Sequence, residues 1–164
     1  MKILVFSDTH GDVSLMKDVV SRNRYDTDLV IHLGDHLKDL QSVMMDYPTI
    51  ASIGVLGNCD FASMHPGAQF EGVFSVENRR IFYTHGHKYN VKTGYEYIVS
   101  NAKFNKADVV LYGHSHIAVF QEFNGVTVIN PGSLSFPRDG SNGTYAVLKV
   151  KSGELKCTIE EIEK

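Results

Sequence analysis

The residues of this chain that are best able to do chemistry are aspartates, histidines and an asparagine that stand in short blocks, most of them beside glycine. Each block directly follows an apolar, β-rich run. In chain order the blocks are Asp8-Thr9-His10-Gly11, Gly34-Asp35, Gly57-Asn58-Cys59-Asp60, Thr84-His85-Gly86-His87 and Gly113-His114-Ser115-His116. Because ligand sites in open α/β sheets form beyond the carboxyl ends of strands, we expect these side chains to lie together in one crevice.

These blocks offer carboxylate, amide and imidazole groups, which are ligands for a metal ion. The candidate ligands are Asp8, His10, Asp35, Asn58, His85, His114 and His116. Oxygen and nitrogen donors without a thiolate favour Mn, Fe, Ni, Co or Zn over Ca or a structural zinc site. Seven residues are too many for one ion, whereas two ions that share a carboxylate would each receive four protein ligands. We therefore expect two divalent metal ions per chain, with Mn first and Ni, Fe, Co, Zn or Mg as alternatives.

Each block taken alone has an ordinary structural explanation. An Asp or Asn after a strand commonly forms a turn or caps a helix, and Gly-Asp carries little information. Their joint occurrence at successive strand ends is harder to explain by packing, because buried Asp and His side chains are costly without a partner. Convergence on metal ions removes that cost, so the metal interpretation is preferred.

Composition and charge set the limits within which such a site must operate. The chain has 164 residues, 43% hydrophobic and 21% charged, which is typical of one globular domain spanning residues 1–164. A net charge of −3 without long basic runs argues against binding a nucleic-acid polymer. Cys59 and Cys157 are too far apart in the sequence to indicate a disulfide framework. The apolar stretch after Met1 is too short for a signal peptide, and no run is long enough to span a membrane, so a cytoplasmic protein without a membrane partner is expected.

The hydrophobic pattern predicts alternating strands and helices in the first half of the chain and mostly antiparallel strands in the second. The expected first-half elements are strand 3–7, helix 13–24, strand 28–33, helix 37–45 and strand 50–56. The expected second-half elements are hairpin 70–76 with 80–84, helix 93–104, strand 108–112, hairpin 117–123 with 126–129, and the pair 144–150 with 156–162. Two packed sheets covered by helices would accommodate both halves.

The five blocks resemble the signature of the calcineurin-like metallophosphoesterases. The short length, Cys59 within its block and the segment Asn130-Pro131-Gly132-Ser133 resemble the small YfcE-like phosphodiesterase subgroup. The resemblance runs from Met1 to about Arg138. It implies an α/β fold, a four-layer α/β/β/α sandwich with two mixed β-sheets, around a dinuclear metal centre.

The resemblance also implies a role for each residue of the blocks. Asp8, His10, Asp35 and His116 would hold the first metal, and Asn58, His85 and His114 the second, with Asp35 bridging both. Asn58 would lie close to the substrate phosphate, and Cys59 and Asp60 beside it are further candidates for a part in catalysis. Many superfamily members have histidine at the position of Cys59, and a thiol is a weaker hydrogen-bond donor. Efficient cleavage of poor leaving groups is therefore not expected.

Several residues near the blocks keep more than one interpretation. Asp60 would either orient a histidine ligand or form a turn with its own backbone. For His36 and His87 a solvated loop position is preferred over lining a substrate cleft, and for Arg138 a surface ion pair is preferred over a phosphate contact. His32 is expected inside a strand without a role.

The function that this sequence predicts is metal-dependent hydrolysis of a small or nucleotide-like phosphodiester by attack of a metal-bridging hydroxide. A phosphomonoesterase or phosphatase on the same dinuclear centre is the first alternative. A non-catalytic scaffold of the same fold, of the retromer type, is the second, although a scaffold has no need for seven intact ligands. A homo-oligomer is compatible with the sequence.

Overall fold

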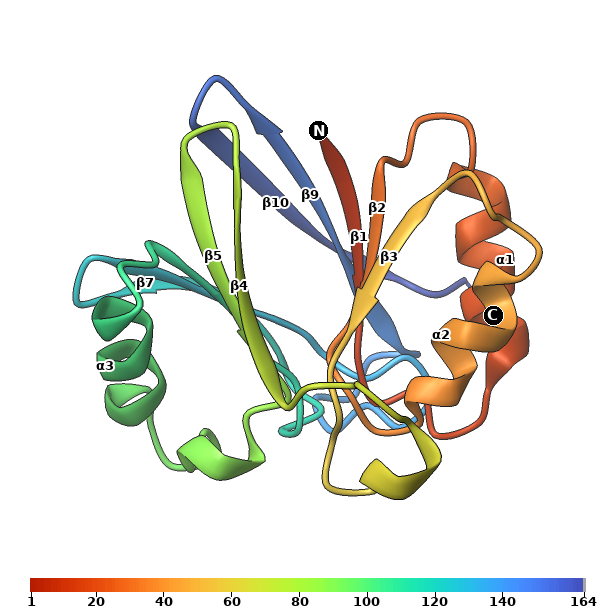
Figure 1. The fold of residues 1–164 in the computed structure, drawn as a ribbon, viewed down its shortest axis with the longest axis horizontal. Coiled ribbons are helices and arrows are strands. Elements are labelled where there is room, and N and C mark those ends of the chain that lie inside the picture. The colour runs from red at the N-terminus through yellow and green to blue at the C-terminus, as the bar shows by residue number, and fades with distance from the viewer. Residues whose placement is uncertain (164) are drawn as a thin grey trace.

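Two five-stranded β-sheets packed face to face, with helices on both outer sides, make up the computed structural model (Figure 1). The structure describes residues 1–163. The strands are β1 (Lys2–Phe6), β2 (Leu29–His32), β3 (Ala51–Gly54), β4 (Glu71–Val76), β5 (Arg79–Thr84), β6 (Val109–Leu111), β7 (Ala118–Phe123), β8 (Val126–Pro131), β9 (Thr144–Lys151) and β10 (Glu154–Glu161). The helices are α1 (Val13–Asn23), α2 (Leu37–Met44) and α3 (Glu96–Phe104), with short 3₁₀ turns η1 (Ala62–Met64) and η2 (His87–Tyr89).

The first sheet has the order β10-β9-β1-β2-β3. Strands β1, β2 and β3 are parallel, as the alternation of strands and helices in the first half of the chain predicts. The C-terminal hairpin extends this sheet, because β9 pairs antiparallel with β1. The two halves of the chain are thereby joined in one sheet.

The second sheet has the order β4-β5-β6-β8-β7. The two expected hairpins are confirmed, since β4 pairs antiparallel with β5 and β7 with β8. However, β5, β6 and β8 are parallel, so the prediction of a mostly antiparallel second half is wrong for the centre of this sheet. The physical reason is that α3 forms a crossover between β5 and β6, which is the connection that parallel neighbours require.

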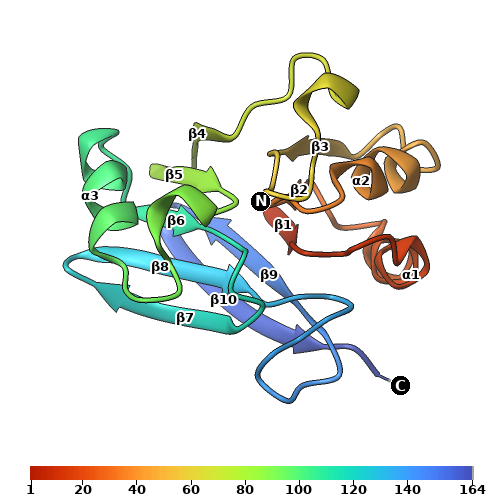
Figure 2. The ribbon, with the colours of Figure 1, turned by 90° about the horizontal axis from the view of Figure 1, so that it is seen from below.

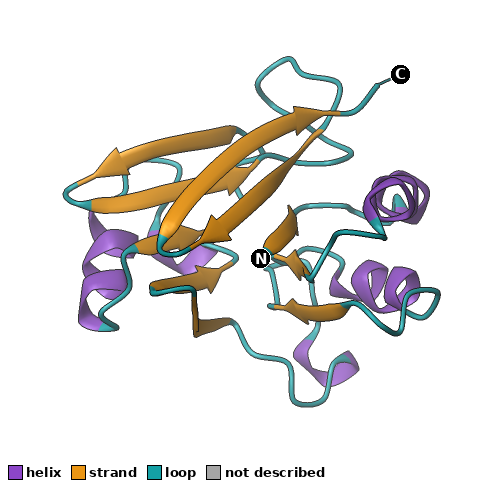
Figure 3. Cartoon of the chain, turned by 90° about the horizontal axis from the view of Figure 1, so that it is seen from above, coloured by secondary structure: helices purple, strands orange, loops and turns teal. Residues whose placement is uncertain are grey.

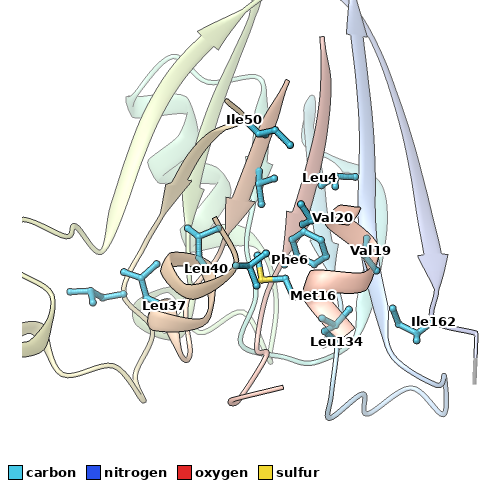
Figure 4. Close-up of a cluster of buried hydrophobic side chains, with 13 residues drawn as sticks. Leu4, Phe6, Met16, Val19, Val20, Leu37, Leu40, Ile50, Leu134 and Ile162 are labelled. Atoms are coloured by element: carbon cyan, nitrogen blue, oxygen red, sulfur yellow. The ribbon is translucent and has the colours of Figure 1, made fainter. Parts of the chain in front are cut away.

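Three apolar layers separate the four layers of the sandwich, and strand alternation decides which side chain enters which layer. On β1, Leu4 and Phe6 pack with α1 and α2, whereas Ile3 and Val5 pack between the two sheets. Figure 4 shows the first of these layers, with Phe6 and Met16 among its labelled side chains. The third layer joins α3 to the second sheet through residues such as Ile98 and Val110.

The order of layers is α3, second sheet, first sheet, and then α1 with α2 (Figures 2 and 3). This arrangement is the four-layer α/β/β/α sandwich with two mixed sheets that the family resemblance implies. Strands β1, β2, β3 and β5 end at the lower edge of the view in Figure 1, and their connecting loops gather there. None of the helices within residues 1–163 combines the length and the apolar character needed to cross a membrane.

Candidate metal centre

The candidate ligands lie on loops that turn sharply at the ends of the strands. Five of them have a left-handed backbone although none is glycine, namely Asp8, His10, Asp35, His114 and His116, with φ between 46° and 67°. Such a conformation is uncommon outside glycine and is concentrated at functional sites.

Glycines beside the ligands allow the loops to approach one another closely. A side chain at Gly57 would overlap the carboxylate of Asp35, and one at Gly113 would overlap the Ser7 hydroxyl. Gly34 has φ of 96°, and a Cβ there would lie 2.6 Å from the Gly57 nitrogen. The glycines of the sequence blocks are therefore required by contacts between the loops as well as by the turns.

The first group of candidate ligands contains Asp8, His10 and His116, whose ligand atoms lie within 4.8 Å of one another. Asp8 Oδ1 is 3.1 Å from His116 Nε2 and 4.0 Å from His10 Nε2. The two histidine Nε2 atoms are 3.4 Å apart. Asp8 Oδ1 is buried and, within residues 1–163, accepts no hydrogen bond of acceptable geometry. This arrangement fits a cation placed among the three side chains.

The second group is arranged around Asp35 and His85. Asp35 Oδ1 lies 3.5 Å from His85 Nε2, while Asp35 Oδ2 lies 3.9 Å from His10 Nε2. Asp8, Asp35 and His85 also form a group of ligand atoms within 4.8 Å. The amide oxygen of Asn58 is 3.1 Å from His85 Nε2. The two oxygens of Asp35 thus face different ligand groups, which is the arrangement expected of a bridging carboxylate.

The protonation of two histidines is fixed by backbone carbonyl groups. His85 Nδ1 is 2.7 Å from the Leu33 carbonyl oxygen, and His116 Nδ1 is 2.7 Å from the Phe136 carbonyl oxygen. Because a carbonyl can only accept, Nδ1 carries the proton in both rings, and in the neutral ring Nε2 presents a lone pair. Both lone pairs face carboxylate or amide oxygens, which repel them unless a cation or a proton intervenes.

The electrostatic environment prepares most of these groups for metal binding. Burial opposes the ionisation of Asp8, but contact with His116, the nearby His85 and the Ser7 hydroxyl together lower its pKa to about 2. Burial lowers the pKa of His10, and burial with the neighbouring His85 lowers the pKa of His114 to about 4. The pKa of His116 is raised by its contact with Asp8. At neutral pH the site therefore presents ionised Asp8 and neutral His10 and His114, and a proton competes with a metal at His116.

His114 and Cys59 occupy less direct positions. The ring of His114 lies 5.1 Å from that of His85, measured between centroids, but its ring nitrogens belong to none of the compact groups. The backbone N–H of His114 donates to Asp8 Oδ2 at 3.0 Å. Cys59 Sγ does belong to one, with His10 and Asp35. Burial and the nearby Asp35 raise the pKa of Cys59 to about 11, so its sulfur is a neutral thiol at neutral pH.

Asp60 binds backbone groups of two loops. Its Oδ2 accepts from the Gly57 N–H at 2.9 Å, and its Oδ1 accepts from the Leu37 N–H at the start of α2, also at 2.9 Å. Within residues 1–163 its carboxylate makes neither a hydrogen bond to a histidine nor an Asx-type turn with the residues that follow it. The carboxylate also ties the loop of Asn58 to the helix that follows Asp35.

A cleft of about 700 Å³ opens in front of the candidate ligands. His36 is among its walls, so the preference for a solvated loop position is wrong for this residue. Arg138 also lines the cleft, and within residues 1–163 no carboxylate lies within ion-pair distance of it, so the preferred surface ion pair is wrong as well. His87 is half-buried behind His85, with ring centroids 5.3 Å apart, rather than solvated. Loop histidines and arginines look alike in sequence, and only the packing of the loops separates them.

Sequence reasoning missed the residues that support the ligand loops. Asn130 donates to the Gly113 carbonyl at 3.0 Å and to the Ser115 hydroxyl at 2.9 Å, and Ser133 donates to the Asp8 carbonyl at 2.8 Å. The Asn130-Pro131-Gly132-Ser133 segment therefore ties together the first and last ligand loops. Its composition was noted in the sequence, but its partners lie more than ten residues away and leave no local pattern.

A second support is a buried network under the first two ligand loops. Thr9 Oγ1 donates to Asp39 Oδ2 at 2.7 Å, and the Gly11 N–H donates to the same oxygen at 2.8 Å. His32 Nε2 lies 2.9 Å from Thr9 Oγ1, and the Gly34 N–H donates to His32 Nδ1 at 3.2 Å. The strand position expected for His32 is confirmed, but the residue is part of this network.

Comparison with known proteins agrees with the fold and the donor set. The model of the calcineurin-like phosphoesterase superfamily domain matches residues 1–153. A probable metallophosphoesterase of Bacillus subtilis, YsnB, is 33% identical over 153 residues, covering 93% of this chain and 86% of that protein. The phosphodiesterase YfcE of Escherichia coli K12 is 33% identical over 105 residues, covering 58% of this chain and 51% of that protein.

Among solved structures, a phosphoesterase-like protein of Streptococcus pneumoniae TIGR4 superposes with a TM-score of 0.81 at 27% identity, covering 98% of this chain and 88% of that one. The two-sheet sandwich and the Asp-, His- and Asn-rich centre at the strand ends agree with these matches to metallophosphoesterases. The chain belongs to the calcineurin-like phosphoesterase superfamily.

Proposed function

We propose that this protein is a dinuclear metal-dependent phosphodiesterase that hydrolyses a small or nucleotide-like phosphodiester. The observation that carries the proposal is that lone pairs of His85 and His116, held by Nδ1 hydrogen bonds, face the oxygens of Asp35 and Asp8. Bound at such a site, two divalent ions would supply hydroxide from water at neutral pH and would neutralise charge that develops on the phosphate. Mn²⁺ is our first candidate, since it accepts carboxylate and imidazole ligands together.

The residues would divide into two ligand sets that share one carboxylate. One ion would be held by Asp8, His10 and His116. The other ion would be held by Asn58, His85 and His114. Asp35 would contact both ions, because each of its oxygens already faces one set. Asp35 Oδ1 also accepts the Cys59 N–H at 2.8 Å, so its orientation is fixed by the backbone.

The substrate would bind through its phosphate in the cleft before these ligands. Asn58 is exposed and lines the cleft. Its Oδ1 lies beside His85 and its amide N–H donates to Cys59 Sγ at 3.4 Å, so this N–H would have to leave the thiol to reach a phosphate oxygen. Cys59 is a weak donor, which limits assistance to a leaving alkoxide. An activated aryl diester makes little demand on a general acid and should be cleaved well. A phosphomonoesterase on the same centre is the alternative, and the test below separates the two.

The decisive assay compares bis(4-nitrophenyl) phosphate with 4-nitrophenyl phosphate, using protein stripped of metal and then loaded with Mn²⁺. The proposal predicts a larger kcat/KM for the diester and loss of both activities on chelation. Asp46→Asn, which alters a carboxylate in a surface ion pair with Lys17, serves as the control and should keep full activity. A monoester cleaved faster than the diester would favour the alternative. The expected cytoplasmic location and the absence of a nucleic-acid partner are not addressed by this assay and stay predictions.

A further inference from the structure

A second cavity opens beside the cleft of about 700 Å³ in front of the candidate ligands, which we call the catalytic cleft. The two cavities share two lining residues. This side pocket, of about 260 Å³, is lined by the apolar or aromatic side chains Val91, Tyr95, Tyr112, Ile117 and Val119. Lys92 and Arg138 line both the side pocket and the catalytic cleft. The two cavities therefore meet at a pair of cations.

The walls of the side pocket are held in place before any ligand arrives. Val91 and Tyr112 are 5% and 1% exposed, respectively. The ring of Tyr95 packs edge-on against Tyr112 and Phe123, with centroids 6.0 Å and 5.7 Å apart. Ile117, by contrast, is 43% exposed at the open side. A rigid apolar floor with an exposed apolar rim is typical of a pocket that takes up part of a ligand.

The two cations lie close to the candidate metal ligands. The backbone N–H of Arg138 donates to the His116 carbonyl oxygen at 2.9 Å, and both cations line the cleft together with His114 and His116. Within residues 1–163 neither side chain has a carboxylate within 4.0 Å. Both are exposed and able to reach an anion that passes from one cavity to the other.

We propose that the side pocket binds one ester arm of the substrate, an aromatic or apolar group, while Lys92 and Arg138 hold oxygens of the adjoining phosphate. This inference rests on the proposed function, because it needs a phosphodiester in the catalytic cleft. A pocket of this size is too small for a whole ligand, for which about 300 Å³ or more is usual, but suits one ring or a short chain. The tyrosine rings favour an aromatic arm through edge-to-face contacts. A diester with one arm that carries a single aromatic ring or a short apolar chain is therefore the substrate class that this surface selects.

Strand β7 supplies matched substitutions for a test. Val119 lines the side pocket, whereas Phe120, its neighbour on the same strand, is exposed and does not line it, because successive side chains of a strand point to opposite faces. Val119→Glu and Ile117→Glu place a charge in the pocket, and Phe120→Glu adds the same charge outside it. Val119→Ile keeps the pocket apolar and should retain the behaviour of the unaltered protein.

With bis(4-nitrophenyl) phosphate as substrate, we expect KM to rise at least about tenfold in Val119→Glu and Ile117→Glu relative to Phe120→Glu. Inorganic phosphate has no ester arm, so its inhibition constant should be unchanged in Phe120→Glu and Val119→Ile. It should rise less than KM in the two pocket variants, whose added carboxylate enters the cavity that Lys92 and Arg138 also line. Equal KM values for Val119→Glu and Phe120→Glu would overturn the assignment. A phosphate inhibition constant that rises in parallel with KM would overturn it too, since the damage would then lie at the catalytic centre.

A binding measurement separates failure of this inference from failure of the proposed function. Protein loaded with Zn²⁺ is titrated with diphenyl phosphate, and the methyl signals of Val91, Ile117 and Val119 are followed by NMR. We expect these signals to shift with diphenyl phosphate and to stay in place with inorganic phosphate. The side-pocket assignment is overturned if diphenyl phosphate does not bind, or if it binds without shifting these methyl signals. Failure to hydrolyse any diester overturns the proposed function alone.

Discussion

At the scale of single residues, the candidate site is defined by groups that repel one another in the absence of a cation. Asp8 is fully buried, and its Oδ1 lies 3.1 Å from His116 Nε2. The hydrogen bond from His116 Nδ1 to the Phe136 carbonyl keeps this Nε2 free of a proton in the neutral ring. A buried carboxylate beside a lone pair is unfavourable, and either a proton on His116 or a metal ion relieves it.

The bridging position of Asp35 predicts an unequal effect of two neighbouring substitutions. Asp35→Ala removes a ligand from both metal sets and should lower kcat/KM for bis(4-nitrophenyl) phosphate at least about 100-fold. Cys59→Ala removes only a neutral thiol and should lower it about tenfold or less. Steady-state kinetics with saturating Mn²⁺ provide the comparison. Similar losses in the two variants would assign the thiol a larger role than its raised pKa allows.

At the scale of elements, the expected strands and helices all form, and their loops deliver the five sequence blocks to one edge. This much was predictable, because strand alternation, helix periodicity and the Asn124-Gly125 turn are local signals. The supports of the site were not predictable in the same way. Ser133 reaches Asp8 across 125 positions and Thr9 reaches Asp39 across 30, and such contacts leave no periodic trace. The cleft-facing position of Arg138 likewise depends on how the loop after β8 packs.

The network under the ligand loops predicts that a buried carboxylate outside the ligand set controls metal affinity. Asp39 accepts from Thr9 and Gly11, which flank His10. In Asp39→Asn the amide oxygen can still accept both hydrogen bonds, but it no longer carries the charge that strengthens them, so His10 should be less well positioned and Mn²⁺ should bind about 10- to 100-fold more weakly. Titration calorimetry measures the affinity, with Asp46→Asn beyond the end of α2 as the matched control. Equal affinities in the two variants would show that the network has no part in positioning His10.

The same network predicts a pH dependence of stability in the metal-free protein. Burial lowers the pKa of His32 from 6.5 to about 4, so the unfolded chain binds a proton before the folded one does. The contribution of neutral His32 to the free energy of unfolding is therefore fully present above pH 6.5. This contribution, up to about 3 kcal/mol, is lost progressively as the pH falls toward 4. Urea unfolding at pH 7.5 and 4.5 should show a smaller decrease in His32→Gln than in the unaltered chain. The same decrease in both proteins would contradict the lowered pKa.

At the scale of the whole molecule, two sheets with their strand ends at one edge create a single centre that must lose protons before it binds metal. The pKa of His116 is raised by Asp8, so its proton is the last to be displaced. Activity with Mn²⁺ should therefore rise from pH 5 toward neutral or mildly alkaline pH, where a metal-bound water also ionises. Rates for matched aryl and alkyl diesters between pH 5 and 9 test this. An optimum near pH 5 would be incompatible with the site described here.

The central claim is that one chain holds two divalent ions that share Asp35. Its most direct test is the number of Mn²⁺ equivalents bound per chain, measured by metal analysis and titration calorimetry on protein stripped and then reloaded. We expect two equivalents for the unaltered chain and for Asp46→Asn, and fewer than two for Asp35→Ala. A stable maximum of one equivalent in the unaltered chain, with full diesterase activity, would contradict the two-metal centre.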